Sequence, residues 1–164
     1  MESEPLLPDY DGACTSNVMR PLLEDPESTP DWFPEPLTGV DQVVMLVLDG
    51  LGWHQMQDHK AHLRGLPAMA STCIRTVAPT TTATALTSIT TGLAPGEHGV
   101  IGYRMNTETD DVLNVLRWCT SKGDARESIP PESVQHDAPF GSQRPPVVVR
   151  AEFRDSGFTL SLIH

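Results

Sequence analysis

The run from Val43 to Leu48 (VVMLVL) is the feature that most narrows the folds open to this chain. It is apolar throughout and rich in valine, and the pair Asp49-Gly50 that follows is a turn signal. Such a run fits a strand buried on both faces, as in the centre of a parallel sheet. It is much too short to cross a bilayer as a helix. We therefore expect an α/β fold with this run as a central strand, and no membrane-spanning segment.

The rest of the chain predicts helices and strands that could surround this strand. Glycine and proline signals and the spacing of apolar residues set their limits. The predicted elements are a helix from about Trp53 to Leu63, a strand over Cys73–Val77, a helix from near Thr82 to just before Gly92, a hairpin of Val100–Met105 with Val112–Trp118, and a third sheet strand over Val147–Val149. Residues 119–146 are expected to be mostly loop.

Acidic charge is concentrated at the N-terminus. Residues 1–41 hold ten acidic side chains and one basic side chain, a net charge of −9. The remaining residues hold twelve acidic and ten basic side chains, a net charge of −2, so the whole chain carries −11. The first 41 residues also hold seven of the fifteen prolines, a composition that disfavours regular structure. We expect residues 1–41 to form an acidic, mostly extended leader arm, with a short helix around Ser16–Leu23, and residues 42–164 to form the α/β domain.

Composition also excludes several classes of protein. No basic stripe is present, which argues against a nucleic-acid binding surface. Three cysteines without paired spacing resemble neither a disulfide framework nor a zinc ribbon. The N-terminus lacks the basic and apolar regions of a signal peptide, so we expect a cytoplasmic location.

A threonine-rich stretch from Pro79 to Gly92 (PTTTATALTSITTG) contains seven threonines. Between Gly65 and Gly96 the only charged residue is Arg75. Threonine runs are typical of edge strands, helix caps and solvated turns. If the strands before Asp49 and Thr82 belong to one parallel sheet, however, both residues follow the carboxyl end of a strand, where open α/β sheets bind ligands.

The pairing of Asp49 with Thr82 suggests chemistry. Thr82 would stand at a helix N-terminus, where free N–H groups and the helix dipole favour an anion. A threonine hydroxyl becomes a nucleophile only with a nearby base or metal ion, and Asp49 offers a hard oxygen ligand for such an ion. The pair predicts a metal-activated threonine alkoxide that attacks phosphorus or sulfur.

Two motifs stand out between roughly residues 43 and 105: VVMLVLDGLG and APTTTATALTSITTGLAPGEHGVIGY. Together they resemble the nucleotide pyrophosphatase/phosphodiesterase branch of the alkaline phosphatase superfamily. That family places a P-x-x-T nucleophile ahead of a helix that ends in T-G-L-x-P-x-x-H-G. The resemblance implies a mixed, mostly parallel sheet flanked by helices, of which this chain would hold the N-terminal part. It also implies that Thr82 is the nucleophile of a phospho-threonine intermediate, and that Asp49 and Thr82 bind one of two divalent metal ions, usually zinc. The implied substrate is a phosphodiester or nucleotide-like small molecule.

The chain departs from the family pattern in two places. Family phosphodiesterases commonly carry an asparagine three residues after the nucleophile, where this chain has Ala85. The family takes its remaining metal ligands, an Asp-His pair among them, from the C-terminal half of a longer chain, and no Asp-His dipeptide follows the matched motifs here; His136, Asp137 and His164 have suitable chemistry but lie outside any matching motif. We therefore expect an incomplete enzyme that is inactive as it stands.

Alternative interpretations remain open at this point. The main alternative is a non-catalytic, anion- or partner-binding remnant of the same fold. A sulfatase would need cysteine or serine at position 82, and this chain has threonine. Among the histidines, His98 is expected to make a structural hydrogen bond, and His54, His59 and His62 to lie on a solvated helix face. The sequence sets no oligomeric state.

Overall fold

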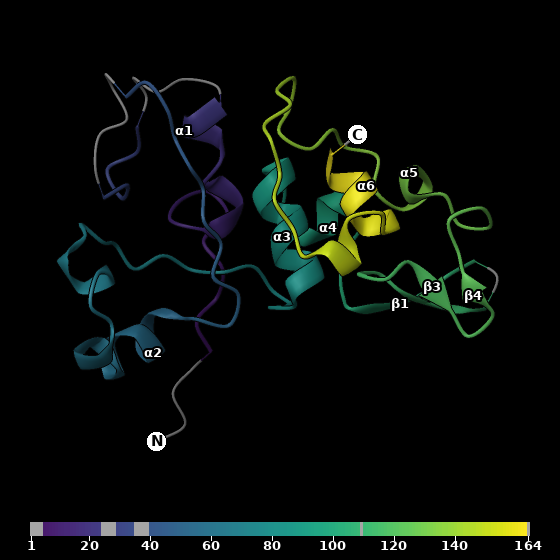
Figure 1. Cartoon of the computed structure of the whole chain (residues 1–164), viewed down its shortest axis with the longest axis horizontal. Coiled ribbons are helices and arrows are strands. Elements are labelled where there is room, and N and C mark those ends of the chain that lie inside the picture. The colour runs from purple at the N-terminus through teal and green to yellow at the C-terminus, as the bar shows by residue number, and fades with distance from the viewer. Residues whose placement is uncertain (1–4, 24–28, 35–39, 109, 164) are drawn as a thin grey trace.

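A computed structural model describes residues 5–23, 29–34, 40–108 and 110–163 of the chain (Figure 1). It contains both helices and strands. The helices are η1 (Thr15–Asn17), α1 (Arg20–Leu23), α2 (Trp53–Asp58), η3 (Lys60–His62), η4 (Leu66–Ala68), α3 (Thr82–Thr91), α4 (Pro95–His98), α5 (Pro131–Val134), η5 (Ala151–Phe153) and α6 (Gly157–Ile163). The strands are β1 (Arg104–Asn106), β2 (Val112–Asn114), β3 (Cys119–Thr120) and β4 (Gly123–Asp124). No helix in the described ranges is long and apolar enough to cross a membrane.

Helix α3 confirms the prediction of a helix from near Thr82 to just before Gly92. It begins after the N-cap residue Thr81 and ends at Gly92, whose φ of 76° is the left-handed conformation that glycine adopts without strain. The threonines in its second half bond to carbonyls of the helix: Thr87 Oγ1 donates to the Ala83 carbonyl at 2.8 Å, and Thr91 Oγ1 donates to the Thr87 carbonyl at 2.7 Å. This back-bonding explains how a threonine-rich segment remains helical with few unpaired polar groups.

Helix α3 is central to the packing. It contacts η1, α4 and α6, and Figure 1 shows it between the N-terminal segment and the C-terminal helix. Trp118 is the largest fully buried side chain, and its Nε1 donates a hydrogen bond to the Ile129 carbonyl at 2.7 Å. The core thus lies between α3, the sheet and α6. Its buried residues are Ala83, Val100, Leu113, Val115, Trp118, Ala125 and Phe158.

The sheet confirms the predicted hairpin, with shorter strands, but it is not the mostly parallel sheet that we expected. It has four strands in the order β1-β2-β3-β4, and every neighbouring pair is antiparallel. Met105 pairs with Leu113, which is 1% exposed and faces the core, while its neighbour Val112 is 46% exposed. The molecule is therefore mixed α/β, but the mostly parallel sheet that we expected does not occur in the described residues.

The three strands predicted to build that parallel sheet are not strands here. Val43–Leu48 and Val147–Val149 have no regular secondary structure, and Cys73–Val77 contributes one parallel bridge, between Arg75 and Cys14. The prediction was wrong because a strand needs a neighbour that supplies backbone partners. The N-terminal segment occupies the backbone of Arg75, and no strand of the described chain pairs with either valine-rich run.

Part of the predicted leader arm packs against the domain. Cys14 and Ser16 are buried, η1 contacts α3, and the Arg75 N–H donates to the Ala13 carbonyl at 2.8 Å. The expectation of a mostly extended arm was thus wrong for this part, because its few apolar side chains reach α3 despite the acidic, proline-rich composition. The helix predicted around Ser16–Leu23 occurs as two short helices, η1 and α1. The division at residue 41 stays a prediction, and the arm's residues 1–4, 24–28 and 35–39 lie outside the described residues.

The helix predicted from about Trp53 to Leu63 is shorter than expected. It occurs as α2 followed by the 3-10 helix η3, and neither contains a buried residue. Trp53 and Met56, the apolar residues of α2, are only half-buried. The apolar residues of this segment therefore do not pack on a sheet, which agrees with the absence of strand pairing by Val43–Leu48.

Candidate functional site

Asp49 and Thr82 are in direct contact. The Thr82 hydroxyl Oγ1 donates a hydrogen bond to Asp49 Oδ2 at 2.8 Å, although the two residues are 33 positions apart in the chain. Asp49 is exposed and Thr82 is half-buried. Any ligand that approaches the start of α3 from solvent therefore meets a hydroxyl and a carboxylate together.

A tight turn presents the Asp49 carboxylate. The Leu51 N–H donates to the Leu48 carbonyl at 3.3 Å, and Gly50 at the third position of this turn has a φ of 79°. That φ suits glycine, because a side chain there would be strained. The turn signal Asp49-Gly50 in the sequence thus correctly marks where the extended run ends and where the carboxylate projects.

The N-terminus of α3 presents the Thr82 hydroxyl. Thr81 caps the helix: its Oγ1 accepts from the Thr84 N–H at 3.4 Å and lies 2.8 Å from the Thr84 hydroxyl. The first helical bond runs from the Ala85 N–H to the Thr81 carbonyl at 2.9 Å, and Thr82 is the first residue of the helix. No acidic residue lies in the first turn of α3, so the carboxylate of Asp49 is the negative charge that complements the helix dipole here. The capping role of Thr81 was not predicted, although a threonine three residues before a backbone donor is a usual capping signal.

His98 is held as a structural residue, as predicted. Its ring is 2% exposed, and its Nδ1 accepts from the Val100 N–H at 3.1 Å. Because Nδ1 is an acceptor, the neutral ring carries its proton on Nε2, which donates to Ser88 Oγ at 2.8 Å. Burial lowers the pKa of His98 below its ordinary 6.5, although Asp137 and Glu97 oppose that shift. The ring is thus neutral at pH 7 and ties α4 to α3.

The described residues do not complete a metal site. They contain no group of three or more histidine, cysteine, aspartate or glutamate side chains placed to hold one ion. Asp49 and Thr82 bring two hard oxygen atoms together, which suits a divalent cation in kind. A zinc ion in a protein is held by about three or four ligands. Asp49 and Thr82 alone therefore do not complete a site for two zinc ions.

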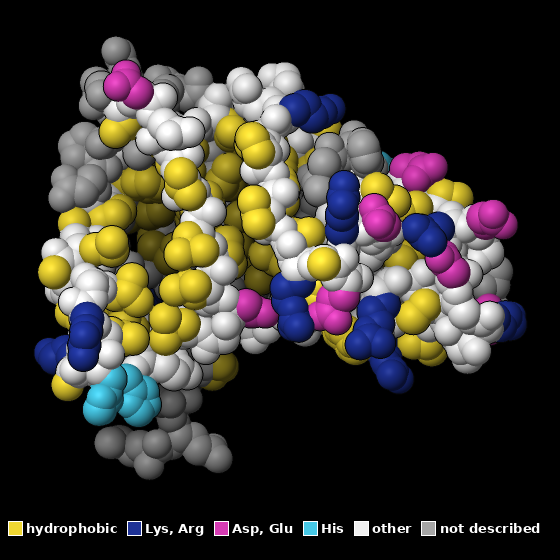
Figure 2. All heavy atoms as spheres, viewed as in Figure 1, with side chains coloured by type: hydrophobic (Ala, Val, Ile, Leu, Met, Phe, Trp, Pro, Cys, Tyr) yellow, Lys and Arg dark blue, Asp and Glu magenta, His cyan; other side chains and the backbone are white. Residues whose placement is uncertain are grey.

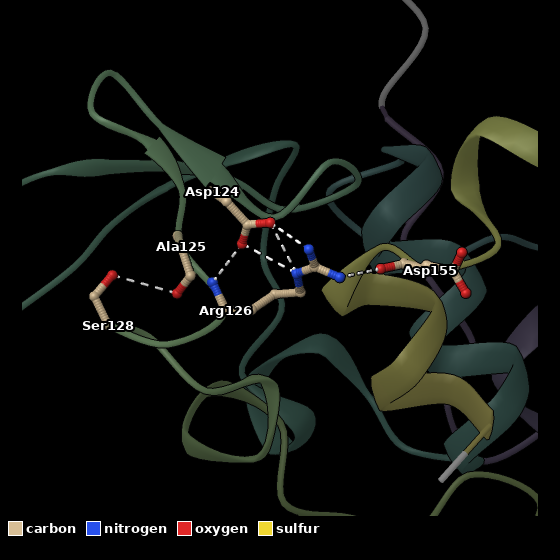
Figure 3. A network of polar contacts seen from close by, with 5 residues as sticks. All are labelled: Asp124, Ala125, Arg126, Ser128 and Asp155. Atoms are coloured by element: carbon tan, nitrogen blue, oxygen red, sulfur yellow. Dashed lines mark hydrogen bonds and ion pairs between the residues drawn. The ribbon is translucent and has the colours of Figure 1, made fainter.

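A hollow in the described part of the chain lies elsewhere, beside β4. It has a volume of about 410 Å³, and its lining includes Arg117, Asp124, Arg126, Glu152 and Asp155 but neither Asp49 nor Thr82. Figure 3 shows Arg126 bridging Asp124 and the Asp155 carbonyl, to which Nη1 donates at 2.8 Å. Hydrogen bonds from the Arg126 side chain lower the pKa of Asp124. Sequence reasoning did not find this network, and because Arg126 is already occupied by both partners, we assign it a structural role.

The profile of the type I phosphodiesterase / nucleotide pyrophosphatase family matches residues 43–163. Neither the curated proteins nor the solved structures gave a significant match. The matched range contains both Asp49 and Thr82 and covers most of the chain. The chain therefore belongs to the type I phosphodiesterase / nucleotide pyrophosphatase family.

Proposed function

We propose that this chain carries the nucleophile-bearing part of a metal-dependent phosphoric ester hydrolase. Thr82 is the nucleophile, and Asp49 is the partner that orients its hydroxyl. The substrate class is a phosphodiester or a nucleotide-like small molecule. The observation that carries the proposal is the hydrogen bond of 2.8 Å from Thr82 Oγ1 to Asp49 Oδ2 at the start of α3, inside the range matched by the family.

The position of Thr82 suits attack on phosphorus. A phosphoryl group at the N-terminus of α3 would meet the positive end of the helix dipole and the N–H groups of its first turn. Thr82 is the first residue of that helix, so its oxygen and those N–H groups face the same incoming group. The hydroxyl proton already points at Asp49, which leaves a lone pair of Oγ1 free to form the new bond.

The reaction follows from these atoms. Thr82 Oγ1 forms a bond to phosphorus while the bond from phosphorus to the leaving oxygen breaks, and the hydroxyl proton passes to the Asp49 carboxylate or to solvent. The product is a phospho-threonine ester and a free alcohol or phenol. Water then attacks phosphorus, the bond from phosphorus to Oγ1 breaks, and threonine takes back a proton.

Metal dependence is part of the proposal, and Asp49 and Thr82 are the two ligands that the described chain offers to a divalent ion. Zinc is the ion that the family assignment favours, and it would lower the pKa of the hydroxyl. Because two ligands fall short of a closed site, we propose that the chain alone turns over little or no substrate. Ala85 adds to this expectation, since it offers no side-chain donor to a phosphate oxygen one turn into α3.

The test combines a metal titration with covalent trapping. The chain is incubated with zinc and an excess of an aryl phosphodiester, released phenol is measured by absorbance, and the protein is examined by mass spectrometry for a phosphoryl adduct. We expect at most one equivalent of phenol and an adduct at Thr82 that is absent from Thr82→Ala. Thr90→Ala is the matched control, because the Thr90 hydroxyl bonds only to carbonyls within α3. Phenol release and an adduct that persist unchanged in Thr82→Ala would show that the nucleophile is assigned wrongly.

A second function deserves a direct comparison: a non-catalytic module that binds an anion or a partner through the start of α3. The incomplete ligand set and Ala85 favour it. Calorimetric titration with zinc and with inorganic phosphate separates the two. Tight binding of two zinc ions would exclude the non-catalytic module. Phosphate binding that persists without zinc and survives Thr82→Ala, in the absence of any adduct, would instead support it.

A further inference from the structure

Asp49 is followed by glycine, and an Asp-Gly pair can rearrange without an enzyme. Because glycine has no side chain to shield its backbone nitrogen, that nitrogen can attack the Cγ atom of the preceding aspartate. The sequence contains two such pairs, Asp11-Gly12 and Asp49-Gly50. Both aspartates are exposed, so the accessibility of the carboxylate does not distinguish the pairs. The backbone around each glycine does distinguish them.

Hydrogen bonds hold the backbone of Asp11-Gly12 on both sides of the glycine. The Gly12 N–H donates to the Asp9 carbonyl at 3.0 Å. The Gly12 carbonyl accepts from the Cys14 N–H at 2.8 Å and from Asn17 Nδ2 at 2.8 Å. The space beside the glycine is also filled, because a Cβ atom added at Gly12 would lie 2.5 Å from Asp9 Oδ2. The nitrogen that would attack Asp11 is therefore both engaged and crowded.

The pair Asp49-Gly50 lacks these restraints. Within the described residues the Gly50 N–H has no hydrogen-bond acceptor, and apart from its chain neighbours no heavy atom lies within 4 Å of a Cβ atom added there. One backbone bond closes the turn around the pair, and it is long: the Leu51 N–H donates to the Leu48 carbonyl at 3.3 Å. The nitrogen beside Asp49 is therefore free and accessible.

The chain before this turn also leaves Asp49 able to move. In the described chain the backbone of Val43–Val47 makes no hydrogen bond, and each side chain of Val43–Leu48 is at least 41% exposed. Figure 2 shows hydrophobic side chains at the surface over a large part of one face of the molecule. Segments with few backbone bonds and few buried contacts open at a low cost in free energy. Rotation of the Asp49 backbone into a geometry that allows attack therefore meets little resistance.

We propose that Asp49 is a site of spontaneous isomerisation to isoaspartate. The Gly50 nitrogen forms a bond to Cγ of the protonated Asp49 carboxyl group. The bond from Cγ to the hydroxyl oxygen breaks, and the hydroxyl leaves as water with the proton of the Gly50 N–H. The product is a succinimide ring. Water then opens the ring at one of its two carbonyl carbons: attack at Cγ restores aspartate, and attack at the main-chain carbon breaks its bond to the Gly50 nitrogen and gives isoaspartate.

Isoaspartate at position 49 would disable the candidate site. The main chain then runs through the former side chain, and the free carboxylate is attached directly to Cα instead of through Cβ. The carboxylate therefore sits closer to the main chain, and the hydrogen bond of 2.8 Å from Thr82 Oγ1 to Asp49 Oδ2 is lost. This consequence follows from the contact itself and holds whether or not Thr82 acts as a nucleophile.

Peptide mapping of the whole chain tests the proposal. The protein is incubated for several weeks near neutral pH, digested, and analysed by liquid chromatography and mass spectrometry with electron-transfer fragmentation, which separates isoaspartate from aspartate although their masses are equal. We expect isoaspartate at position 49 to form about tenfold faster or more than at position 11, because the bonds of Gly12 must open before its nitrogen can attack. Methyl transfer by an isoaspartate methyltransferase gives an independent count of modified residues.

The chain unfolded in guanidinium chloride is the matched control, because neither Asp-Gly pair is then restrained. The two positions should react there at similar rates, so the difference in the folded chain measures the effect of the structure. Thr82→Ala provides a second comparison, since it removes the hydrogen bond that holds the Asp49 carboxylate against α3. The rate at position 49 should rise about two- to fivefold in this variant. Thr90→Ala, whose hydroxyl bonds only within α3, should leave the rate unchanged.

Three outcomes would overturn the proposal. They are a reaction at position 11 as fast as at position 49 in the folded chain, a folded chain that stays unmodified at position 49 while the unfolded chain reacts, and a rate that Thr82→Ala does not raise. Circular dichroism before and after incubation checks that the fold is retained. None of these measurements uses hydrolase activity, so the isomerisation and the proposed function can fail independently.

Discussion

Gly157 packs directly against the ring of Trp118, and we predict that Gly157→Ala destabilises the protein for this reason. A Cβ atom added at Gly157 would lie 2.2 Å from Cγ, 2.5 Å from Cδ2 and 2.6 Å from Cδ1 of Trp118. Carbon atoms in contact normally stay about 3.5 Å apart or more. Either the start of α6 or the indole must therefore move.

The size of the effect follows from how Trp118 is held. The side chain is 1% exposed in the core, and its Nε1 donates to the Ile129 carbonyl at 2.7 Å. Overpacking a well-packed site costs about 1–3 kcal/mol, and loss of the indole hydrogen bond would add about 1 kcal/mol. Because alanine is a better helix former than glycine, the substitution also stabilises the helix by up to about 1 kcal/mol. We expect a net loss of about 1–3 kcal/mol in the free energy of unfolding, which for a chain of this size lowers the melting temperature by roughly 2–4 °C per kcal/mol.

Urea unfolding followed by circular dichroism measures this loss. Gly96→Ala in α4 is the matched control, because no heavy atom lies within 4 Å of the added Cβ there. We expect that control to be neutral or slightly stabilising. The same small change at both positions would refute the steric argument. A double-mutant cycle with Trp118→Phe sharpens it further: the alanine should cost less beside the smaller ring.

Three further predictions concern local interactions. Burial lowers the pKa of His98, so the unfolded chain binds a proton at this histidine before the folded chain does as pH falls below 6.5. The contribution of His98 to the free energy of unfolding should therefore be complete above pH 6.5 and decline below it. His98→Gln should flatten the pH dependence of the urea midpoint. Thr81→Ala should cost about 1 kcal/mol through loss of the cap of α3, whereas Thr81→Ser should cost only a few tenths, both measured by urea unfolding. Hydrogen bonds from Arg126 lower the pKa of Asp124 from its ordinary 3.8. The contribution of this exposed pair to the free energy of unfolding should therefore be present above pH 3.8 and be lost as pH falls through the pKa of the folded state. It should also shrink in Asp124→Asn and in high salt.

Elements with local signals could be predicted from the sequence. The limits of α3 follow from the threonines before it and from Gly92 after it, and the β1–β2 hairpin follows from two apolar runs around a polar linker. The structural role of His98 was also predictable, since a histidine in a short turn beside a buried helix has backbone and hydroxyl partners nearby. Each of these depends on residues close together in the chain.

The predictions that failed concern pairings between distant segments. The composition of Val43–Leu48 predicted burial, but burial of a strand requires a partner, and the run itself does not specify one. Arg75 pairs with Cys14 in the N-terminal segment instead. That segment was expected to extend away because of its charge and prolines, yet Cys14 and Ser16 are buried. Average composition could not reveal that a few residues of the leader would pack on α3.

We predicted that Asp49 and Thr82 lie close together, but not their direct hydrogen bond, and the physical reason given for their proximity was wrong. We argued that a shared parallel sheet would bring the two residues to one edge, and the described chain has no such sheet. The contact is made instead by two local devices, the turn at Gly50 and the cap of α3 by Thr81, joined by one exposed hydrogen bond. A single bond of that kind stabilises by only about 1 kcal/mol.

The position of Asp49 therefore depends on what holds the segment before it. Val43–Leu48 leads directly into the turn at Gly50, and its open backbone and exposed side chains give that turn little support. Any contact that fixes the backbone up to Leu48, one residue before the carboxylate, would lower the conformational entropy lost when Asp49 engages Thr82 and a ligand. The stability of the candidate site thus depends on how the apolar segment before Asp49 is held.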